Sequence, residues 1–190
     1  MIVYIHGASA TAESFNYIRD HISGENICLE YDSKNGFAEN LAIMANTIKK
    51  YDKIFFIAHS LGGIYSLHLA QMFPEKVLGA VTLSTPYGGS KSADYVKYFL
   101  PFSRLMRDIG PNSFPMREMN KVKIFWPWCN IVTVNGQSPF MTEKNDGVVT
   151  IASMKHLADK MEIVEVGINH YEVVISSQVI DIIKQRLITC

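Results

Sequence analysis

Residues 54–64 read Ile-Phe-Phe-Ile-Ala-His-Ser-Leu-Gly-Gly-Ile, and this stretch indicates both the fold and the chemistry. Its first five residues are apolar, as in a buried strand, and a helical pattern begins directly after Ser60. A serine at so sharp a strand-to-helix turn needs small neighbours, which Ala58 and Gly62 supply. The pattern Ala-x-Ser-x-Gly therefore predicts a nucleophile elbow that exposes the Ser60 hydroxyl. The alternative is an ordinary strand, a serine N-cap and a helix that packs through its glycine pair.

A second short apolar run, residues 2–8, ends in His6-Gly7-Ala8. Glycine at the end of a strand permits a tight turn that exposes the next backbone N–H group. We therefore expect the N–H groups of Ala8 and Leu61 to form an oxyanion hole, with Leu61 opening the helix after Ser60.

Five short motifs follow one another along the whole chain. They are Ile5-His6-Gly7-Ala8, Ala58-His59-Ser60-Leu61-Gly62-Gly63, Thr85-Pro86-Tyr87-Gly88-Gly89-Ser90, Asn145-Asp146-Gly147-Val148-Val149 and Asn169-His170. With these motifs the chain resembles the α/β-hydrolase superfamily, most closely the small bacterial lipases and esterases and the lipase-like GPI inositol deacylase family. Together the motifs are specific for the superfamily, though not for a substrate. The resemblance implies a minimal, six-stranded version of the fold, without the two leading antiparallel strands of larger hydrolases.

Strand-like and helix-like segments alternate along the chain. The strand-like runs are 2–5, 27–30, 53–58, 77–83, 130–135 and 162–166. The helix-like runs are 11–22, 37–50, 61–73, 92–100, 115–120, 152–159 and 171–187. This alternation predicts an α/β protein whose mainly parallel sheet carries helices on both faces. We expect a single α/β-hydrolase domain over residues 1–190, with residues 84–129 as a short cap-like or lid-like excursion.

The acid that would accompany Ser60 is expected in the polar loop after the strand at 130–135, because open α/β sheets place their ligands at the carboxyl ends of strands. Asp146 lies in Asn145-Asp146-Gly147, matches the family's acid position and is the predicted catalytic acid. Glu143 is the reserve candidate, and Asp146-Gly147 is also an ordinary turn dipeptide.

Six histidines compete for the role of general base. Only His170 follows the last strand across a short loop, directly before the final helix, and we predict that it is the base. His6 is expected to brace the oxyanion loop, and His59 to project away from the elbow. The remaining three are His21, His68 and His156, which have the pattern of helix or surface residues.

Aromatic and apolar residues are concentrated between positions 84 and 129. We predict that Tyr87, Phe99, Phe102 and Phe114 bind substrate as part of an acyl-binding wall or lid, with Trp126 and Trp128 adding to it. The alternative is that these side chains only cover the edge of the sheet.

Composition excludes several classes of function. The formal net charge of zero, without a basic stripe, argues against nucleic acid as a partner, and no apolar run is long enough for a transmembrane segment. The three cysteines form no CxxC pair and are expected to be free thiols. The N-terminus shows no signal-peptide pattern, which predicts a cytoplasmic protein, although release by another route stays open. No metal or cofactor is implied, and we expect a monomer.

The sequence thus predicts a serine esterase or lipase that uses Ser60, Asp146 and His170 on a small-molecule or lipid ester. We expect an apolar acyl chain in preference to acetyl or sugar-linked esters. The same residues also suit an acyltransferase, a thioesterase or an amidase, and a catalytically silent binding protein is a further alternative.

Overall fold

The computed structural model describes residues 1–32, 34–89, 110, 113–139 and 141–188. Within these residues, six strands form one sheet in the order β2-β1-β3-β4-β5-β6, and every neighbouring pair is parallel. The strands are β1 (Ile2–Ile5), β2 (Asn26–Leu29), β3 (Ile54–His59), β4 (Val77–Leu83), β5 (Trp128–Thr133) and β6 (Glu162–Val166). This arrangement confirms the α/β class and the six-stranded sheet that the sequence predicts.

Helical segments connect the strands. They are η1 (Ala12–Phe15), α1 (Asn16–His21), α2 (Phe37–Ile48), α3 (Leu61–Met72), η2 (Pro74–Lys76), α6 (Phe114–Lys121), α7 (Ile151–Met154), η3 (Glu172–Ile175) and α8 (Ser177–Ile188). Two predicted helices, 11–22 and 171–187, are each divided into a 3-10 turn and an α-helix. The run predicted at 152–159 forms only the single turn of α7, and the run at 92–100 lies outside the described residues.

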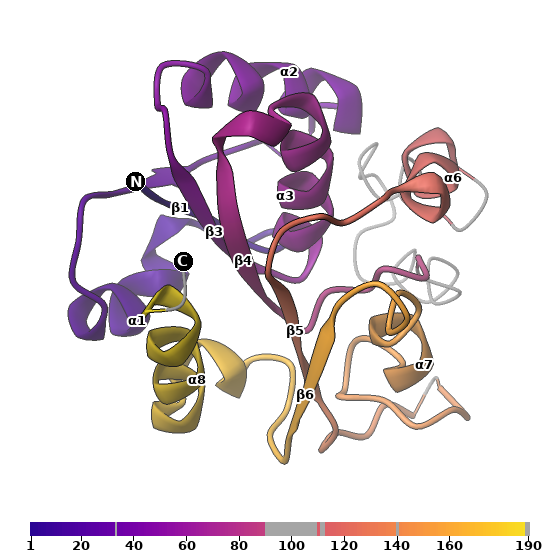
Figure 1. Ribbon diagram of the computed structural model, residues 1–190. Helices are drawn as coiled ribbons and strands as arrows, with labels where there is room; N and C mark the ends of the chain where they lie inside the picture. The colour runs from indigo at the N-terminus through magenta and orange to yellow at the C-terminus, as the bar shows by residue number, and fades with distance from the viewer. Residues whose placement is uncertain (33, 90–109, 111–112, 140, 189–190) are drawn as a thin grey trace.

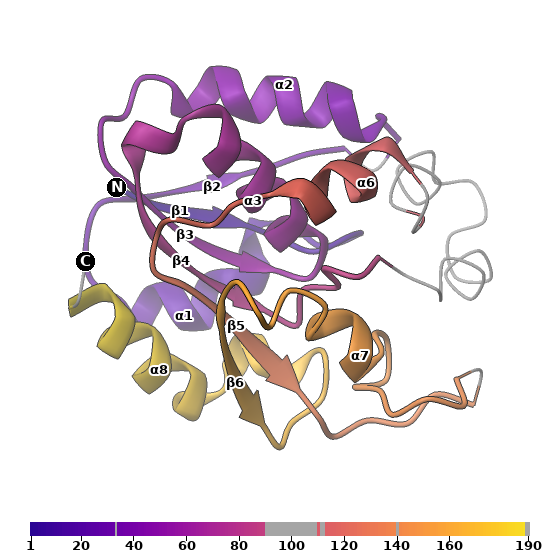
Figure 2. The same ribbon diagram turned by 45° about the vertical axis from the view of Figure 1, so that its right-hand side comes forward.

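The two faces of the sheet bury separate apolar clusters, because successive side chains of a strand point to opposite faces. In β1, Val3 and Ile5 pack with α2, α3 and α6, whereas Ile2 and Tyr4 pack with α1 and α8. Figures 1 and 2 show the same division, with α2, α3 and α6 on one side of the sheet and α1 and α8 on the other. Strands covered on both faces are nearly continuous apolar runs, as residues 54–58 of β3 are.

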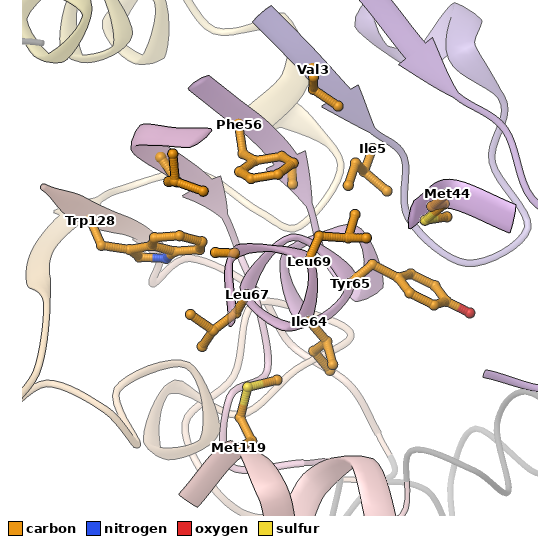
Figure 3. Packing of buried hydrophobic residues seen from close by; sticks show 14 of the residues in the cluster. Val3, Ile5, Met44, Phe56, Ile64, Tyr65, Leu67, Leu69, Met119 and Trp128 are labelled. Atoms are coloured by element: carbon orange, nitrogen blue, oxygen red, sulfur yellow. The ribbon is translucent and has the colours of Figure 1, made fainter. Parts of the chain in front are cut away.

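Helix α3 is buried on most of its circumference. It lies against the sheet and between α2 and α6, so that Ile64, Leu67 and Leu69 point in different directions and are all fully buried (Figure 3). A helix that is buried all round is apolar all round. Ser60 directly precedes this helix, which is the most buried of the described helices.

Strand β5 begins at Trp128, two residues earlier than predicted. Trp128 is therefore a buried core residue at the amino end of β5, and Trp126 donates its indole proton to the backbone oxygen of Pro74 over 2.9 Å. Both tryptophans lie away from the carboxyl ends of the strands, so the prediction that they extend an acyl-binding wall there is wrong. Residues 90–109 and 111–112 of the expected cap lie outside the described residues.

Among the described residues, Cys28 and Cys129 are free thiols. None of the helices in the described part of the chain combines the length and the hydropathy needed to cross a bilayer.

Candidate active site

Ser60 occupies the sharp turn between β3 and α3. Its backbone has φ 52° and ψ −120°, a conformation that costs a residue with a side chain about 1–3 kcal/mol. The N–H of Ser60 donates to the oxygen of Leu83 over 2.8 Å, which fixes the turn to β4. The Ser60 side chain forms no capping hydrogen bond to α3, so the alternative of an ordinary serine N-cap is wrong.

The two glycines after the serine allow α3 to begin in very little space. A Cβ atom on Gly62 would lie 2.0 Å from the backbone oxygen of Ile5, and one on Gly63 would lie 1.9 Å from Oγ1 of Thr85. Backbone atoms cannot yield as a flexible side chain can. The first turn of α3 is therefore wedged between the end of β1 and the loop after β4, which brings residues 6–8 next to Ser60.

Asp146 and His170 form a buried hydrogen-bonded pair. His170 Nδ1 lies 2.7 Å from Asp146 Oδ2, and both side chains are at least 96% buried. The other carboxylate oxygen, Oδ1, accepts the N–H groups of Val148 and Val149 over 3.0 and 2.7 Å. Burial alone raises the pKa of Asp146, but the hydrogen bonds from His170, Thr133 and Val149 outweigh it and hold the pKa below its usual value. Asp146 is therefore ionised at neutral pH.

His170 is joined to the elbow through the residue that precedes Ser60. His59 Nε2 lies 3.0 Å from the backbone oxygen of His170, and the two imidazole rings are 4.9 Å apart between centroids. Among the described residues the Ser60 hydroxyl forms no hydrogen bond, so a direct contact from Ser60 to His170 is not formed in this structure. Such contacts often tighten only when substrate binds.

His59 is itself neutral and fixed in one tautomer. Burial, with His170 nearby, lowers the pKa of His59 to about 3. A carbonyl oxygen can only accept, so the single proton of His59 lies on Nε2 and is donated to His170. Its other nitrogen, Nδ1, is buried without a hydrogen-bond partner and faces Gly7, where a Cβ atom would lie 3.0 Å away.

The loop after β1 carries the expected second oxyanion donor. Ala10 N donates to Gly7 O over 3.3 Å, closing a turn around Ala8 in which Ser9 has φ 57°. His6, buried at the start of this loop, stacks on Tyr31 with 4.3 Å between ring centroids and lies 3.0 Å from Glu30. These contacts brace the loop against the residues that directly follow β2, as expected for His6.

Leu61 is the first residue of α3, and its N–H belongs to the first turn, whose donors have no intrahelical acceptor. A Cβ atom on Gly7 would lie 3.3 Å from Cβ of Ser60. The structure thus brings the loop of Ala8 and the start of α3 together at Ser60.

Of the predicted substrate-binding residues, Tyr87 is a structural residue and not a substrate contact. It is fully buried, with its hydroxyl donating to Thr82 Oγ1 over 3.0 Å and accepting from Trp128 Nε1 over 2.9 Å. Burial raises the pKa of its phenol. Phe114 is 68% exposed at the start of α6, and Phe99 and Phe102 lie outside the described residues. Glu143, the reserve acid, is exposed and makes no contact with His170.

Three polar residues lie in the site although the sequence analysis did not predict them there: His59, Ser84 and Thr133. Thr133 ends β5 and hydrogen-bonds to Asp146, and Ser84 follows β4 and hydrogen-bonds to Thr133. A signal was present, since each is a polar residue at the carboxyl end of an apolar strand. In the described ranges, no group of three or more His, Cys, Asp or Glu side chains is arranged to hold a metal ion.

The chain is similar in sequence and in structure to known hydrolases. A family model for the alpha/beta hydrolase fold matches residues 36–119. A lipase of Bacillus licheniformis in its mature form superposes with a TM-score of 0.76 at 14% identity, covering 98% of this chain and 91% of the lipase. A structure from work on carboxylesterases of Nitrososphaera gargenis gives 0.73 at 15% identity, covering 99% and 89%. The Vlm2 thioesterase domain gives 0.61 at 16% identity, covering 97% and 94%. The chain therefore has the α/β-hydrolase fold, and it resembles the lipases and esterases that share this fold.

Proposed function

We propose that this protein is a serine hydrolase that cleaves carboxylic esters through Ser60, His170 and Asp146. The observation that carries the proposal is the buried Asp146–His170 hydrogen bond of 2.7 Å, tied by His59 to a strained serine at the start of α3. A carboxylate held at Nδ1 of an imidazole leaves Nε2 as the nitrogen that can accept a proton. Strain at a serine whose side chain does not cap its helix is typical of a nucleophile.

In the acylation step, Ser60 Oγ attacks the ester carbonyl and its proton passes to His170 Nε2. Asp146 keeps the imidazole in the required tautomer and stabilises the imidazolium that forms. Collapse of the tetrahedral intermediate breaks the bond to the alcohol oxygen, which takes the proton from His170 and leaves an acyl-enzyme. Water then attacks the acyl-enzyme with His170 again as base, releasing the acid and restoring Ser60.

The negative charge of the tetrahedral intermediate would be held by the N–H groups of Ala8 and Leu61. The wedging of α3 against the end of β1 supports this assignment, because it brings both backbone segments to Ser60. One such donor is worth about 3–4 kcal/mol of activation free energy in enzymes where it has been removed.

The substrate's acyl chain is proposed to be apolar. This proposal rests on the sequence around Phe99 and Phe102 and on the exposed Phe114, since Tyr87 is excluded by its burial. Each methylene that leaves water contributes about 0.8 kcal/mol at most. The measurement is kcat/KM across p-nitrophenyl esters of increasing chain length, repeated with Phe99→Ala and Phe102→Ala. A flat profile would contradict the proposal.

Thioester cleavage is a second candidate, favoured by the structural similarity to a thioesterase domain. The same acyl-enzyme serves both reactions, and the leaving group distinguishes them. Matched oxygen esters and thioesters of one acyl chain, assayed side by side with alcohol acceptors added, separate hydrolysis of esters from hydrolysis of thioesters and from acyl transfer.

The deciding experiment compares Ser60→Ala with Ser66→Ala. Ser66 lies on the same helix and is buried, with its hydroxyl bonded to Gly63 O over 2.8 Å, so this variant controls for loss of a buried hydroxyl. We expect Ser60→Ala to lose ester turnover and labelling by a fluorophosphonate, and Ser66→Ala to retain both. Retained turnover in Ser60→Ala would overturn the assignment. If the wild-type protein is neither labelled nor active, the result would favour the alternative of a catalytically silent binding protein.

A further inference from the structure

A row of two buried hydroxyl groups leads to the Asp146 carboxylate, and the proposed chemistry does not use it. Ser84 Oγ lies 2.8 Å from Thr133 Oγ1, and Thr133 Oγ1 lies 2.5 Å from Asp146 Oδ2. Ser84 and Thr133 are fully buried. Each is at the carboxyl end of its strand, Ser84 directly after β4 and Thr133 at the end of β5.

The direction of each hydrogen bond follows from the chemistry of the partners. An ionised carboxylate can only accept, so Thr133 donates its single proton to Asp146. Thr133 therefore has no proton left for Ser84, and Ser84 must donate to Thr133. The sulfur of Met154, 3.7 Å from Thr133 Oγ1, is a weak acceptor and does not compete with a charged oxygen at 2.5 Å.

We propose that Thr133 and Ser84 are positioning residues for the reaction, which orient the Asp146 carboxylate toward His170 and anchor it to the sheet. This inference rests on the proposed function of the same site.

Without these two hydroxyls, the carboxylate would be held, among the described residues, only by its own loop and by His170, the residue that it has to orient. Its oxygen Oδ1 accepts only from Val148 and Val149, which belong to the same turn as Asp146. The bond from Thr133 joins Oδ2 to β5, and the bond from Ser84 extends the link to the end of β4. The oxygen that receives the proton of Thr133 is also the one bonded to His170, so its position sets the direction of the imidazole.

The strained backbone of Ser84 supports a functional role for its side chain. Ser84 has φ 52°, in the left-handed region that glycine adopts without cost, and its N–H donates to Ile131 O over 2.8 Å. A serine held in this conformation directs its hydroxyl toward Thr133 at a cost in stability that a glycine would avoid.

The first test compares Thr133→Val, Thr133→Ser and Thr82→Val in ester hydrolysis. Thr82 is an equally buried threonine at the end of β4 whose hydroxyl bonds to Asn130 and Tyr87, so Thr82→Val controls for loss of a buried hydroxyl. For Thr133→Val we expect kcat to fall about ten- to hundredfold with KM unchanged, the range that one hydrogen bond to a charged group is worth. Thr133→Ser should restore kcat to near the wild-type value, and Thr82→Val should retain it.

The second test uses Ser84→Gly and Ser84→Ala, which both lose the hydroxyl but differ in backbone strain. We expect both variants to lose about two- to tenfold in kcat, as for one neutral hydrogen bond, whereas Ser84→Gly should be the more stable to urea. A kcat that follows stability, normal in Ser84→Gly and low in Ser84→Ala, would overturn the positioning role. Because Ser84→Gly relieves the backbone strain at residue 84, the comparison of the two Ser84 variants remains informative if Thr133→Val does not fold.

A third measurement does not depend on turnover. The proton that His170 Nδ1 shares with Asp146 is read by NMR as a low-field resonance, assigned by its loss in His170→Gln. We expect this resonance to move in Thr133→Val and to a lesser extent in Ser84→Gly, and to stay in place in Thr82→Val. An unmoved resonance in Thr133→Val would overturn the inference, whereas a moved resonance in a protein without esterase activity would leave it standing and overturn only the proposed function.

Discussion

The side chain of His59 donates its Nε2 proton to the backbone oxygen of His170 across 3.0 Å, a contact between residues 111 positions apart in the sequence. His59 is the last residue of β3 and precedes Ser60, so the contact ties the loop of His170 directly to the elbow. On its other side the same ring lies against Gly7 in the loop proposed to supply an oxyanion donor. A neutral imidazole thus stands between the two loops that the proposed reaction needs.

Burial of neutral His59 predicts a loss of stability in mild acid. Its pKa is about 3 in the folded protein and 6.5 in the unfolded chain, so below pH 6.5 the unfolded state binds a proton that the folded state does not. The free energy of unfolding should then fall by up to about 1.4 kcal/mol per pH unit as the pH decreases from 6.5 toward 3. In His59→Gln, which retains an N–H donor and does not titrate, the slope should be smaller.

Urea unfolding of both proteins between about pH 4.5 and 7.5 measures this difference. The depressed pKa of Asp146 adds a loss of the same sign, but only as the pH falls below the ordinary carboxyl value of 3.8, outside this range. Parallel stability curves for wild type and His59→Gln would show that His59 does not carry the effect.

Asp146→Asn should nearly abolish catalysis while Glu143→Gln should not. If the side-chain nitrogen of asparagine takes the position of Oδ2, it cannot accept the hydrogen bonds of Thr133 and His170. Asparagine also carries no charge to stabilise the imidazolium. We expect kcat to fall by about 10³–10⁴-fold, as for loss of the acid in other triads. Glu143→Gln, in the same loop but exposed, is the matched control in the ester assay. Equal losses in the two variants would leave the acid unassigned.

Three glycines should respond to alanine in a fixed order of destabilisation. Gly62→Ala places a methyl group 2.0 Å from Ile5 O and should cost about 3 kcal/mol or more. Gly147→Ala meets no atom within 4 Å but has φ +100°, so only backbone strain of about 1–2 kcal/mol applies. Gly167→Ala has neither problem and should change stability by less than about 1 kcal/mol. Thermal or urea unfolding of the three variants checks the order, and a tolerated Gly62→Ala would contradict the wedged geometry of α3.

Ser60→Gly should be more stable than Ser60→Ala, although both lack the proposed nucleophile. At φ 52° and ψ −120° a glycine has no Cβ to strain, whereas alanine keeps the strain of serine. We expect a difference of about 1 kcal/mol after the greater chain entropy of glycine in the unfolded state is subtracted. The comparison is made by urea unfolding at one pH, and a more stable Ser60→Ala would mean that the turn is not strained by its side chain.

Features that depend on local pattern could be predicted from the sequence. The runs at 2–5, 77–83 and 162–166 match β1, β4 and β6 to the residue. For β1 and β4 the reason is that strands covered on both faces are nearly continuous apolar runs. The pairing of Asp146 with His170 was inferred from their positions after consecutive strands, and the structure brings them into hydrogen-bonding contact.

Features that depend on side-chain direction and packing across the sheet could not be predicted. Tyr87 follows a strand near Ser60, as expected of a substrate residue, but its side chain turns into the core and reaches Thr82 and Trp128. His59 and Ser84 were missed as parts of the site because their partners lie 111 and 49 positions away, beyond any local periodicity.

The position of β6 has a consequence for how the protein would lose activity on heating. Among the described residues β6 is an outer strand, paired only with β5 and partly exposed, and ion pairs of its Glu162 and Glu165 with Arg186 and Lys155 hold it. His170 lies in the loop after this strand, whereas Ser60 follows β3 in the middle of the sheet. Local fraying of this outer strand would therefore separate the proposed base from the proposed nucleophile while the rest of the molecule stayed folded. Inactivation would precede global melting, and it would do so earlier at high ionic strength, where exposed ion pairs are screened.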